Sequence, residues 1–179
     1  MKIIKKIWTE EKPTFEGKYY SIAEAINSPK PVQKPHPPIL IGGRGRKLTL
    51  RIVAELADQC NFGGSLEPEG YVEILDVLNR HYAKVDRSPD EIEKTHIVYD
   101  AIIARSERDL KQKIKRFKPK NVSAHKFIKG NLIGTPEQIV EKIYKFIDVG
   151  VTYFMLRFLD MMALEPLMMF AEQVIPTFK

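Results

Sequence analysis

Short apolar runs alternate along the chain with longer segments in which apolar residues recur every three or four positions. Four short runs, near Ile39, Gln59, Ile97 and Phe154, have the length and composition of buried strands. An amphipathic helical pattern follows each of them. Because strands that alternate with helices form parallel sheets, the pattern predicts an α/β fold with four parallel βα units. The continuous run Ile39–Ile41 predicts a strand that is buried on both faces.

Local signals set the ends of several helices. Thr135 is a suitable N-cap, Pro136 suits the first helical position, and Gln138 completes a capping box, while Gly150 ends the segment. Ser106 is the expected cap of an earlier helix that runs to about residue 117, and residues 118–131 are expected to be irregular. In the last helix, residues 161–174, we expect the methionines to pack in the core, namely Met161, Met162, Met168 and Met169.

The N-terminal part of the chain has a different pattern. Lys2–Glu10 places three isoleucines on one side of a short helix. Thr14–Ser21 predicts a small β-hairpin that turns at Glu16 and Gly17, and a proline-bearing connector then leads to the first strand of the sheet.

A glycine turn between the Ile39 strand and the next helix, expected from about Arg46 to Ala57, is the main candidate for a binding site. Its members are Gly42, Gly43 and Gly45, interleaved with Arg44, Arg46 and Lys47. Glycines leave backbone N–H groups accessible, and a helix start adds unpaired donors, so the turn has the outline of a phosphate site. A purely structural turn is the alternative, since the spacing fits neither the GxGxxG fingerprint nor the P-loop.

Composition and charge narrow the classes of function. The chain has 179 residues, 44% of them hydrophobic, and its net charge of +6 comes from basic and acidic residues interspersed along the whole length. This mixture favours a solvated surface over a nucleic-acid groove. No apolar run is long enough for a membrane span, and the start MKIIKK leads into a charged segment instead of a signal peptide.

The potential metal ligands and nucleophiles are few. The single cysteine, Cys60, lies in an apolar stretch, which predicts a buried, inert thiol and suits a reducing cytoplasm. No spacing of the four histidines matches a zinc site, and no GxSxG elbow is present. We therefore expect neither a metal centre nor a serine nucleophile.

Two separated motifs carry a family resemblance. PVQKPHPPILIGGRG with ELADQCN, followed by LIGTPEQIVEKIYKFIDVGVTYFMLRF, resembles the C-terminal half of the bacterial luciferase-like flavin-dependent oxidoreductases. The resemblance covers nearly the whole chain. It implies that residues 1–179 form a single partial domain, the C-terminal half of a (β/α)8 TIM barrel with strands five to eight. A preceding half with strands one to four is expected in a complete member.

The resemblance also implies positions for the cofactor. Gly42, Gly43, Arg44 and Gly45 would lie beside the phosphate of FMN or of the deazaflavin coenzyme F-420, and Arg46 would add positive charge. Asn61 and Arg157 would line the pocket, because they come at strand ends. For Arg157 the alternative is a salt bridge to Asp160 or Glu165. No catalytic residue can be assigned.

Two functions follow from the resemblance. In the first, the chain is part of a monooxygenase or hydride-transferring reductase that acts on a small molecule. In the second, it is a non-catalytic half-barrel that assembles with itself or with a separate N-terminal half. Both imply a partner, either as a homo-oligomer or as that second half, because an isolated half-barrel leaves two open sheet edges. Neither involves nucleic acid or a membrane.

Overall fold

The structure is a computed structural model that describes residues 1–160 and 162–178. It shows an α/β fold with a parallel sheet and a small antiparallel hairpin, which confirms the predicted fold class. The sheet strands are β3 (Leu40–Gly42), β4 (Gln59–Asn61), β5 (Glu93–Ile103), β6 (Leu132–Gly134) and β7 (Tyr153–Phe158). The helices among them are α2 (Thr49–Leu56), α3 (Pro68–Tyr82), η1 (Pro89–Glu91), α4 (Glu107–Phe117), α5 (Ala124–Lys129), α6 (Pro136–Asp148), α7 (Leu164–Gln173) and η2 (Ile175–Phe178).

The long strand β5 is the centre of the sheet. β3 pairs with β4, β4 pairs with the beginning of β5, and β7 runs along the other side of β5. These four strands are the predicted ones. The sheet contains one strand that we did not predict, because β6 pairs with the far end of β5 at Ala101–Ile103. α5 is a second unpredicted element, and it lies in the segment that we expected to be irregular.

Helices α2, α3 and α6 cover one face of this sheet. Their apolar side chains form a core with Cys60 and Phe62 of the β4 region, and a second cluster joins α6 and α7 to β5. The opposite face is open along β3, β4 and the first part of β5, whereas α4 and α5 bury Ile102 and Ile133 at its far end. Leu40 is 40% exposed, Tyr99 48% and Tyr153 51%, so the first strand is not buried on both faces as its apolar run predicts.

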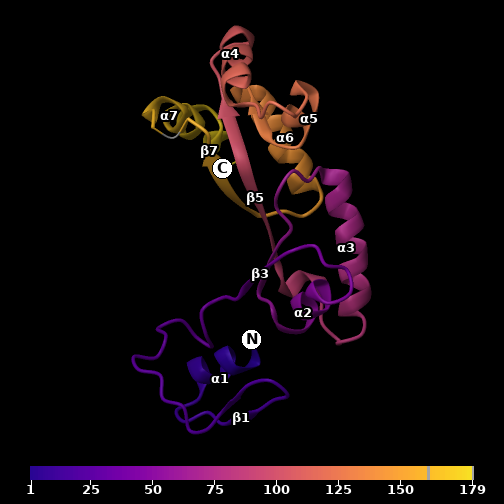
Figure 1. Cartoon of the computed structure of the whole chain (residues 1–179), viewed down its shortest axis with the longest axis vertical. Coiled ribbons are helices and arrows are strands. Elements are labelled where there is room, and N and C mark those ends of the chain that lie inside the picture. Colours follow the sequence, from indigo (N-terminus) through magenta and orange to yellow (C-terminus); the bar gives the residue numbers. More distant parts are fainter. Residues whose placement is uncertain (161, 179) are drawn as a thin grey trace.

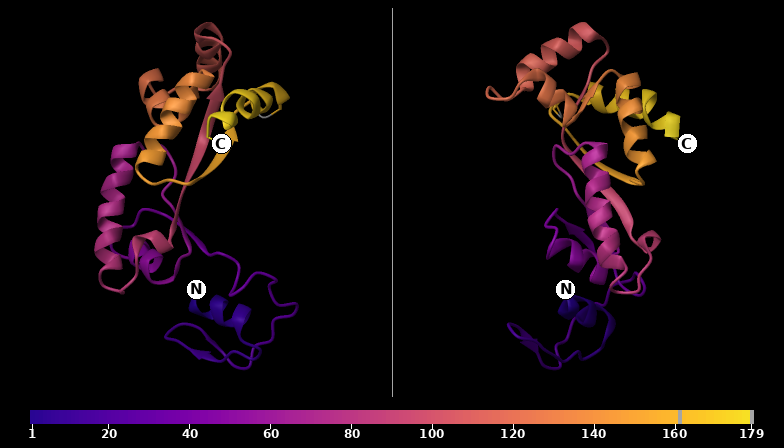
Figure 2. Two further views of the ribbon diagram at one scale, coloured as in Figure 1. Left: turned by 180° about the vertical axis from the view of Figure 1, so that it is seen from behind. Right: turned by 90° about the vertical axis from the view of Figure 1, so that its right-hand side faces the viewer.

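The N-terminal segment lies apart from this body. It contains α1 (Lys2–Thr9) and a hairpin of β1 (Phe15–Glu16) with β2 (Ser21–Ile22). In Figure 1 this segment occupies one end of an elongated molecule and α4 the other, and both views of Figure 2 agree. The hairpin turns through residues 17–20, not at Glu16 and Gly17, and Tyr19 and Tyr20 are exposed in its loop.

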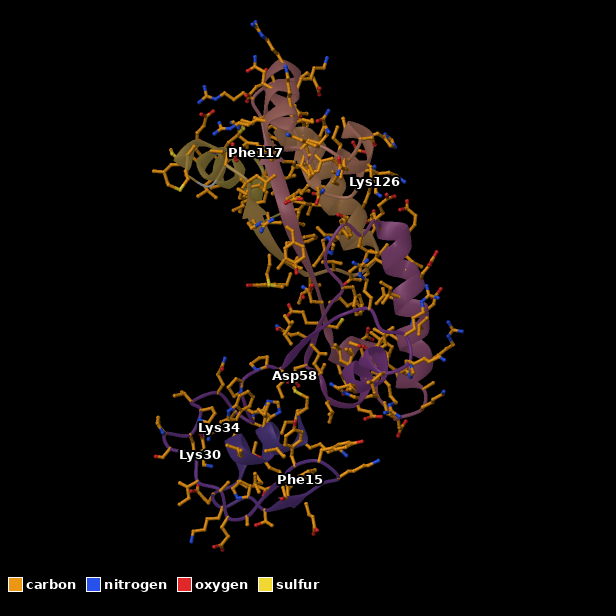
Figure 3. All side chains as sticks on the ribbon, in the orientation of Figure 1. Phe15, Lys30, Lys34, Asp58, Phe117 and Lys126 are labelled. Carbon is orange, nitrogen blue, oxygen red and sulfur yellow. The ribbon has the colours of Figure 1, made fainter. Side chains whose placement is uncertain are left out.

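Few contacts tie the N-terminal segment to the sheet. Figure 3 places Phe15, Lys30 and Lys34 within the segment and Asp58 at the start of the body. The Asp58 carboxylate accepts a hydrogen bond from the Ile39 N–H at 2.7 Å and lies 3.8 Å from His36 Nδ1.

The helix ends confirm most of the capping signals. The Thr135 N–H donates to Gln138 Oε1 at 3.0 Å, which is the backward arm of the capping box. Ser106 Oγ accepts from the Asp109 N–H at 3.3 Å. The expectation for the methionines was wrong for Met162 and Met168, which are 97% and 56% exposed, whereas Met169 is buried. Met161 lies outside the described residues.

Candidate functional site

The glycine turn connects the end of β3 to the start of α2. The Gly43 N–H donates to the Asn61 carbonyl oxygen at 2.9 Å, and the Gly45 carbonyl oxygen accepts from the Leu50 N–H at 3.0 Å. The helix begins at Thr49, three residues after the predicted start. The turn is therefore longer than expected, and it is fastened at one end to β4 and at the other to α2.

Close approach to Thr49 explains two of the glycines. A Cβ atom on Gly45 would lie 2.6 Å from Thr49 Oγ1, and one on Gly43 would lie 3.2 Å from Thr49 Cγ2. Gly43 also has a φ of +128°, in the region that disfavours L side chains. The structure of the turn therefore favours glycine at positions 43 and 45, whether or not the turn binds a ligand.

The turn leaves several backbone donors accessible. The Gly43 N–H is already paired with Asn61. Within the described residues, none of the hydrogen bonds uses the N–H groups of Arg44, Gly45 or Arg46. These three consecutive donors precede the first turn of α2, where the helix dipole also favours an anion.

The basic side chains of the turn differ in their partners. Arg46 Nη2 lies 3.4 Å from Glu73 Oε2 of α3, and both side chains are largely exposed. Arg44 takes part in none of the ion pairs among the described residues. Its Nη2 lies so close to Gly64 that a Cβ atom there would be 3.0 Å away. Arg44 therefore extends over the end of β4 and keeps an uncompensated positive charge beside the turn.

Asn61 is buried, at 6% exposed, and all of its polar groups have partners. Its Nδ2 donates to Thr95 Oγ1 at 2.7 Å, and its Oδ1 accepts from the Gly63 N–H at 2.9 Å. The Thr95 hydroxyl donates in turn to the Cys60 carbonyl oxygen at 2.9 Å. Asn61 therefore joins the ends of β3 and β4 to the beginning of β5, and these contacts position the strand end that carries the glycine turn.

Replacing Asn61 by alanine is expected to lower the free energy of unfolding by about 2 kcal/mol, because the Gly63 N–H and the Thr95 hydroxyl lose buried partners. Urea denaturation of Asn61→Ala would measure the loss. Asn79→Ala on the exposed side of α3 is the control, and its free energy of unfolding should stay within about 0.5 kcal/mol of that of the parent. Equal midpoints for the two variants would contradict the proposed network.

Arg157 has partners that the sequence did not indicate. Its Nε donates to the Tyr99 carbonyl oxygen at 2.6 Å, and its Nη2 lies 3.0 Å from Asp100 Oδ1. The alternative pairing with Asp160 or Glu165 was wrong. Those two carboxylates are paired instead with Lys113 and Arg105, at 2.9 Å and 2.7 Å.

The register of the sheet separates Arg157 from the glycine turn. Gly42 is paired with Asn61, Asn61 with Thr95, and Thr95 with Tyr153. Arg157 lies four residues farther along β7, which corresponds to about 13 Å at the usual rise of a strand. Arg157 lies on the open face of the sheet, whereas the turn lies at the end of β3. A single phosphate group cannot contact both, so Arg157 could only meet a different part of an extended ligand.

Two buried groups near the turn complete its surroundings. Cys60 is fully buried, as expected, and burial raises the pKa of its thiol to about 12, which disfavours the reactive thiolate. His96 of β5 is 2% exposed, and burial, with a smaller effect of the Arg44 charge, lowers the pKa of its imidazole to about 4. Sequence reasoning considered His96 only as a metal ligand. Its place inside the apolar run of a strand was the signal that it is buried.

Comparison with known proteins places these features in a family. The sequence model of the luciferase-like monooxygenase family matches residues 1–128, which include the hairpin, the glycine turn and β4. The chain belongs to the luciferase-like monooxygenase family. The resemblance that the motifs indicated is thereby confirmed.

Relatives within the luciferase-like family use two kinds of cofactor. The chain is 27% identical over 209 aligned residues to an FMNH2-dependent dimethylsulfone monooxygenase of Pseudomonas putida, covering 98% of this chain and 56% of that protein. It is 34% identical over 92 residues to a coenzyme F-420-dependent glucose-6-phosphate dehydrogenase of Microbacterium testaceum, covering 51% of this chain and 26% of that protein. The chain thus spans about half of the first relative and a quarter of the second.

A solved structure supports the fold. The coenzyme F-420-dependent tetrahydromethanopterin reductase of Methanopyrus kandleri superposes with a TM-score of 0.79 at 18% identity, over 99% of this chain and 61% of that one. Among residues 1–160 and 162–178, every helix is too short or too polar to cross a membrane.

Proposed function

We propose that this chain forms the phosphate-binding side of an oxidoreductase that uses FMN or coenzyme F-420. The observation that carries the proposal is the glycine turn, where three accessible backbone donors, a helix start and the uncompensated charge of Arg44 lie together. The relatives supply the identity of the cofactor, since both kinds carry a phosphate.

The residues present fit such a cofactor. The N–H groups of Arg44, Gly45 and Arg46 would bind phosphate oxygens, and the Arg44 guanidinium would neutralise their charge. Arg46 would contribute after exchanging its exposed contact with Glu73 for the ligand. When bound, the cofactor supplies the redox chemistry, by accepting or donating hydride in both cases and by activating oxygen in the case of FMN. Arg157 and Tyr99 would line the far end of the open face.

The open face also indicates that a complete site needs more protein. The open face of the sheet is exposed at Leu40, Tyr99 and Tyr153. The chain covers 56% of its monooxygenase relative. A second copy of the chain or a separate half with the missing strands would cover this face and exclude water. The whole activity, a monooxygenase or a reductase acting on a small molecule, belongs to that completed assembly.

A non-catalytic half-barrel that serves only in assembly is the second candidate. The observation that favours it is the structural use of the glycines, since Gly43 and Gly45 are required by their contact with Thr49 even without a ligand. Under this function the chain would associate without binding a cofactor.

A titration with FMN and with riboflavin, which lacks the phosphate, tests the proposal. We expect FMN to bind more tightly, and Arg44→Gln with Arg46→Gln to weaken FMN about 10- to 100-fold, as charged hydrogen bonds are lost. Riboflavin affinity should change little. Flavin fluorescence gives the affinity, and coenzyme F-420 is titrated in parallel.

Arg51→Gln is the matched control, because Arg51 is an exposed arginine of α2 that pairs with Glu55. It should bind FMN like the parent. Equal affinity of the parent for FMN and riboflavin, or no loss in the double variant, would overturn the proposed phosphate site. If the folded chain binds neither cofactor but sedimentation shows an oligomer, the assembly function is supported instead.

A further inference from the structure

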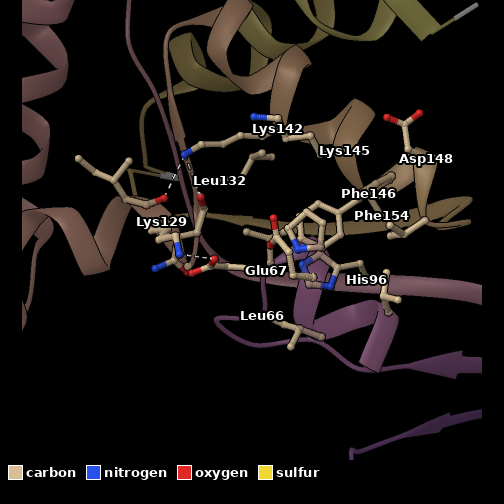
Figure 4. Close-up of a pocket in the computed structure, with 18 of the residues that line it drawn as sticks. Leu66, Glu67, His96, Lys129, Leu132, Lys142, Lys145, Phe146, Asp148 and Phe154 are labelled. Atoms are coloured by element: carbon tan, nitrogen blue, oxygen red, sulfur yellow. Dashed lines mark hydrogen bonds and ion pairs between the residues drawn. The ribbon is translucent and has the colours of Figure 1, made fainter. Parts of the chain in front are cut away.

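A cavity of about 560 Å³ lies on the other face of the sheet, among the helices. Its walls come from the start of α3, from α5, and from α6, and its floor is β5, as Figure 4 shows. It lies on the helix-covered side because the His96 ring of β5 stacks on Phe146 of α6 at 4.3 Å between ring centroids. Its size is that of a site for a small organic molecule.

The lining of the cavity is mainly apolar. Phe146 and Phe154 form one wall beside His96, and Leu66 and Leu132 approach from other sides. Val98 continues the floor along β5. An apolar ligand would be removed from water on several sides in such a site.

The basic groups at the rim are already engaged. Lys129 Nζ lies 2.6 Å from Glu67 Oε2, and Lys145 Nζ lies 2.7 Å from Glu141 Oε1. Lys142 Nζ donates to three carbonyl oxygens, those of Ile128, Asn131 and Ile133, at 3.0, 3.3 and 2.9 Å. The lining also contains three carboxylates, those of Glu67, Glu69 and Asp148, which balance the three lysines, so a neutral ligand fits better than an anion or a cation.

One buried polar group at the floor lacks a partner. His96 is 2% exposed, and its Nδ1 forms no hydrogen bond within the described part of the chain. Nδ1 itself has almost no accessible surface, so a ligand in the cavity can reach only the other ring nitrogen, Nε2, which likewise forms no hydrogen bond among the described residues. Buried polar groups are nearly always paired, so an imidazole that lines a cavity without a partner points to a missing one. The imidazole is neutral at neutral pH and has one donor and one acceptor nitrogen. A hydroxyl group, which both donates and accepts, suits either tautomer.

We propose that this cavity binds a neutral, mainly apolar small molecule whose single hydroxyl group hydrogen-bonds to the His96 imidazole. The site is distinct from the proposed phosphate site, because none of the residues 42–47 of the glycine turn lines the cavity. Its occupancy does not depend on binding of FMN or coenzyme F-420.

The test uses a matched pair of probes, 4-propylphenol and 4-propylanisole, in which the hydroxyl is methylated. We expect the phenol to bind about tenfold more tightly, since only it can pair with His96. Nuclear magnetic resonance of the full chain gives both affinities. Nuclear Overhauser effects from the probe to the methyl groups of Val98 and Leu132 would locate it.

Two variants separate the hydroxyl contact from the apolar walls. His96→Phe keeps an aromatic ring against Phe146 but removes both nitrogens, so the two probes should bind it equally. Val72 is a partly exposed residue of the cavity wall. Val72→Trp should lower the affinity for both probes about tenfold, which is the loss expected when part of an apolar contact surface is removed. Ile147→Trp is its control, because Ile147 is similarly exposed on α6 but does not line the cavity.

Three results would overturn the proposal. The first is equal affinity of the parent for the two probes. The second is Overhauser contacts with Tyr99 or Tyr153, which would place the probe on the open face of the sheet. The third is binding that is insensitive to Val72→Trp. Each concerns binding of the two probes and not of a flavin, so failure here leaves the FMN and riboflavin comparison unaffected.

Discussion

Gly63→Ala is expected to destabilise the fold by about 3 kcal/mol or more, the upper range for overpacking in a core. A Cβ atom on Gly63 would lie 1.9 Å from Ile97 Cγ2 and 2.8 Å from both the Ile97 carbonyl oxygen and Asn61 Oδ1. The methyl group of Ile97 can rotate away. The carbonyl oxygen cannot, because it belongs to the central strand β5 and accepts from the Gly64 N–H.

Urea denaturation would measure this loss against Gly42→Ala as a control. Gly42 is the last residue of β3, and the nearest atom to its Cβ position is the Asn61 carbonyl oxygen at 3.9 Å, an ordinary contact. Gly63→Ala combined with Ile97→Ala should recover only part of the stability, since the clash with the backbone oxygen remains. A midpoint for Gly63→Ala near that of Gly42→Ala would show that β4 and β5 separate more easily than their packing indicates.

The elements that sequence predicted best are those with local signals. The helix after Thr135 begins and ends where its cap and Gly150 place it, and Ser106 caps α4 as expected. These signals act within one turn of the chain, so they can be read without knowing the tertiary structure. α5 and β6 were missed because each is short, and the pairing that makes β6 a strand comes from the distant end of β5.

The open face of the sheet could not be predicted from the chain. The run Ile39–Ile41 has the composition of a strand covered on both sides, yet Leu40 is 40% exposed. An apolar residue indicates that its surface is suited to burial, but it does not indicate which molecule covers that surface. The exposure of Tyr153 and Arg157 on the same face agrees with the proposal that further protein covers it.

The contiguous residues of the candidate site were predictable from the sequence, but its contacts between strands were not. The glycine turn and its basic residues are contiguous, so their proximity followed from the sequence. The partners of Arg157, in contrast, are Tyr99 and Asp100 of a neighbouring strand, whose register sets the contact. Likewise, the network of Asn61 depends on Thr95, which sequence reasoning had no means of placing beside it.

Lowering the pH from 6.5 to 4 is expected to remove about 3 kcal/mol of stability through His96. The pKa of this imidazole is lowered in the folded protein from 6.5 to about 4, first by burial and then by the charge of Arg44. Each unit of difference corresponds to about 1.4 kcal/mol. Tyr71 and Phe146, which pack against the ring from α3 and α6, carry no charge that would favour the imidazolium.

The direction of this pH effect follows from proton binding in the folded and unfolded states. Between these pH values the unfolded chain binds a proton at His96 and the folded chain does not, so the free energy of unfolding falls as the pH falls. The contribution is complete above pH 6.5 and is lost as the pH approaches the folded pKa of about 4. Other groups also titrate in this pH range, so the contribution of His96 is isolated only by comparing variants.

His96→Phe should therefore have a flatter dependence of stability on pH than the parent, because phenylalanine retains the stacking on Phe146 without binding a proton. His125→Gln, at an exposed histidine of α5, should keep the slope of the parent. Urea denaturation at several pH values between 4 and 7 gives the three slopes. Identical slopes for the parent and His96→Phe would mean that the ring gains a partner on protonation, and that water or a rim carboxylate reaches Nδ1 in solution.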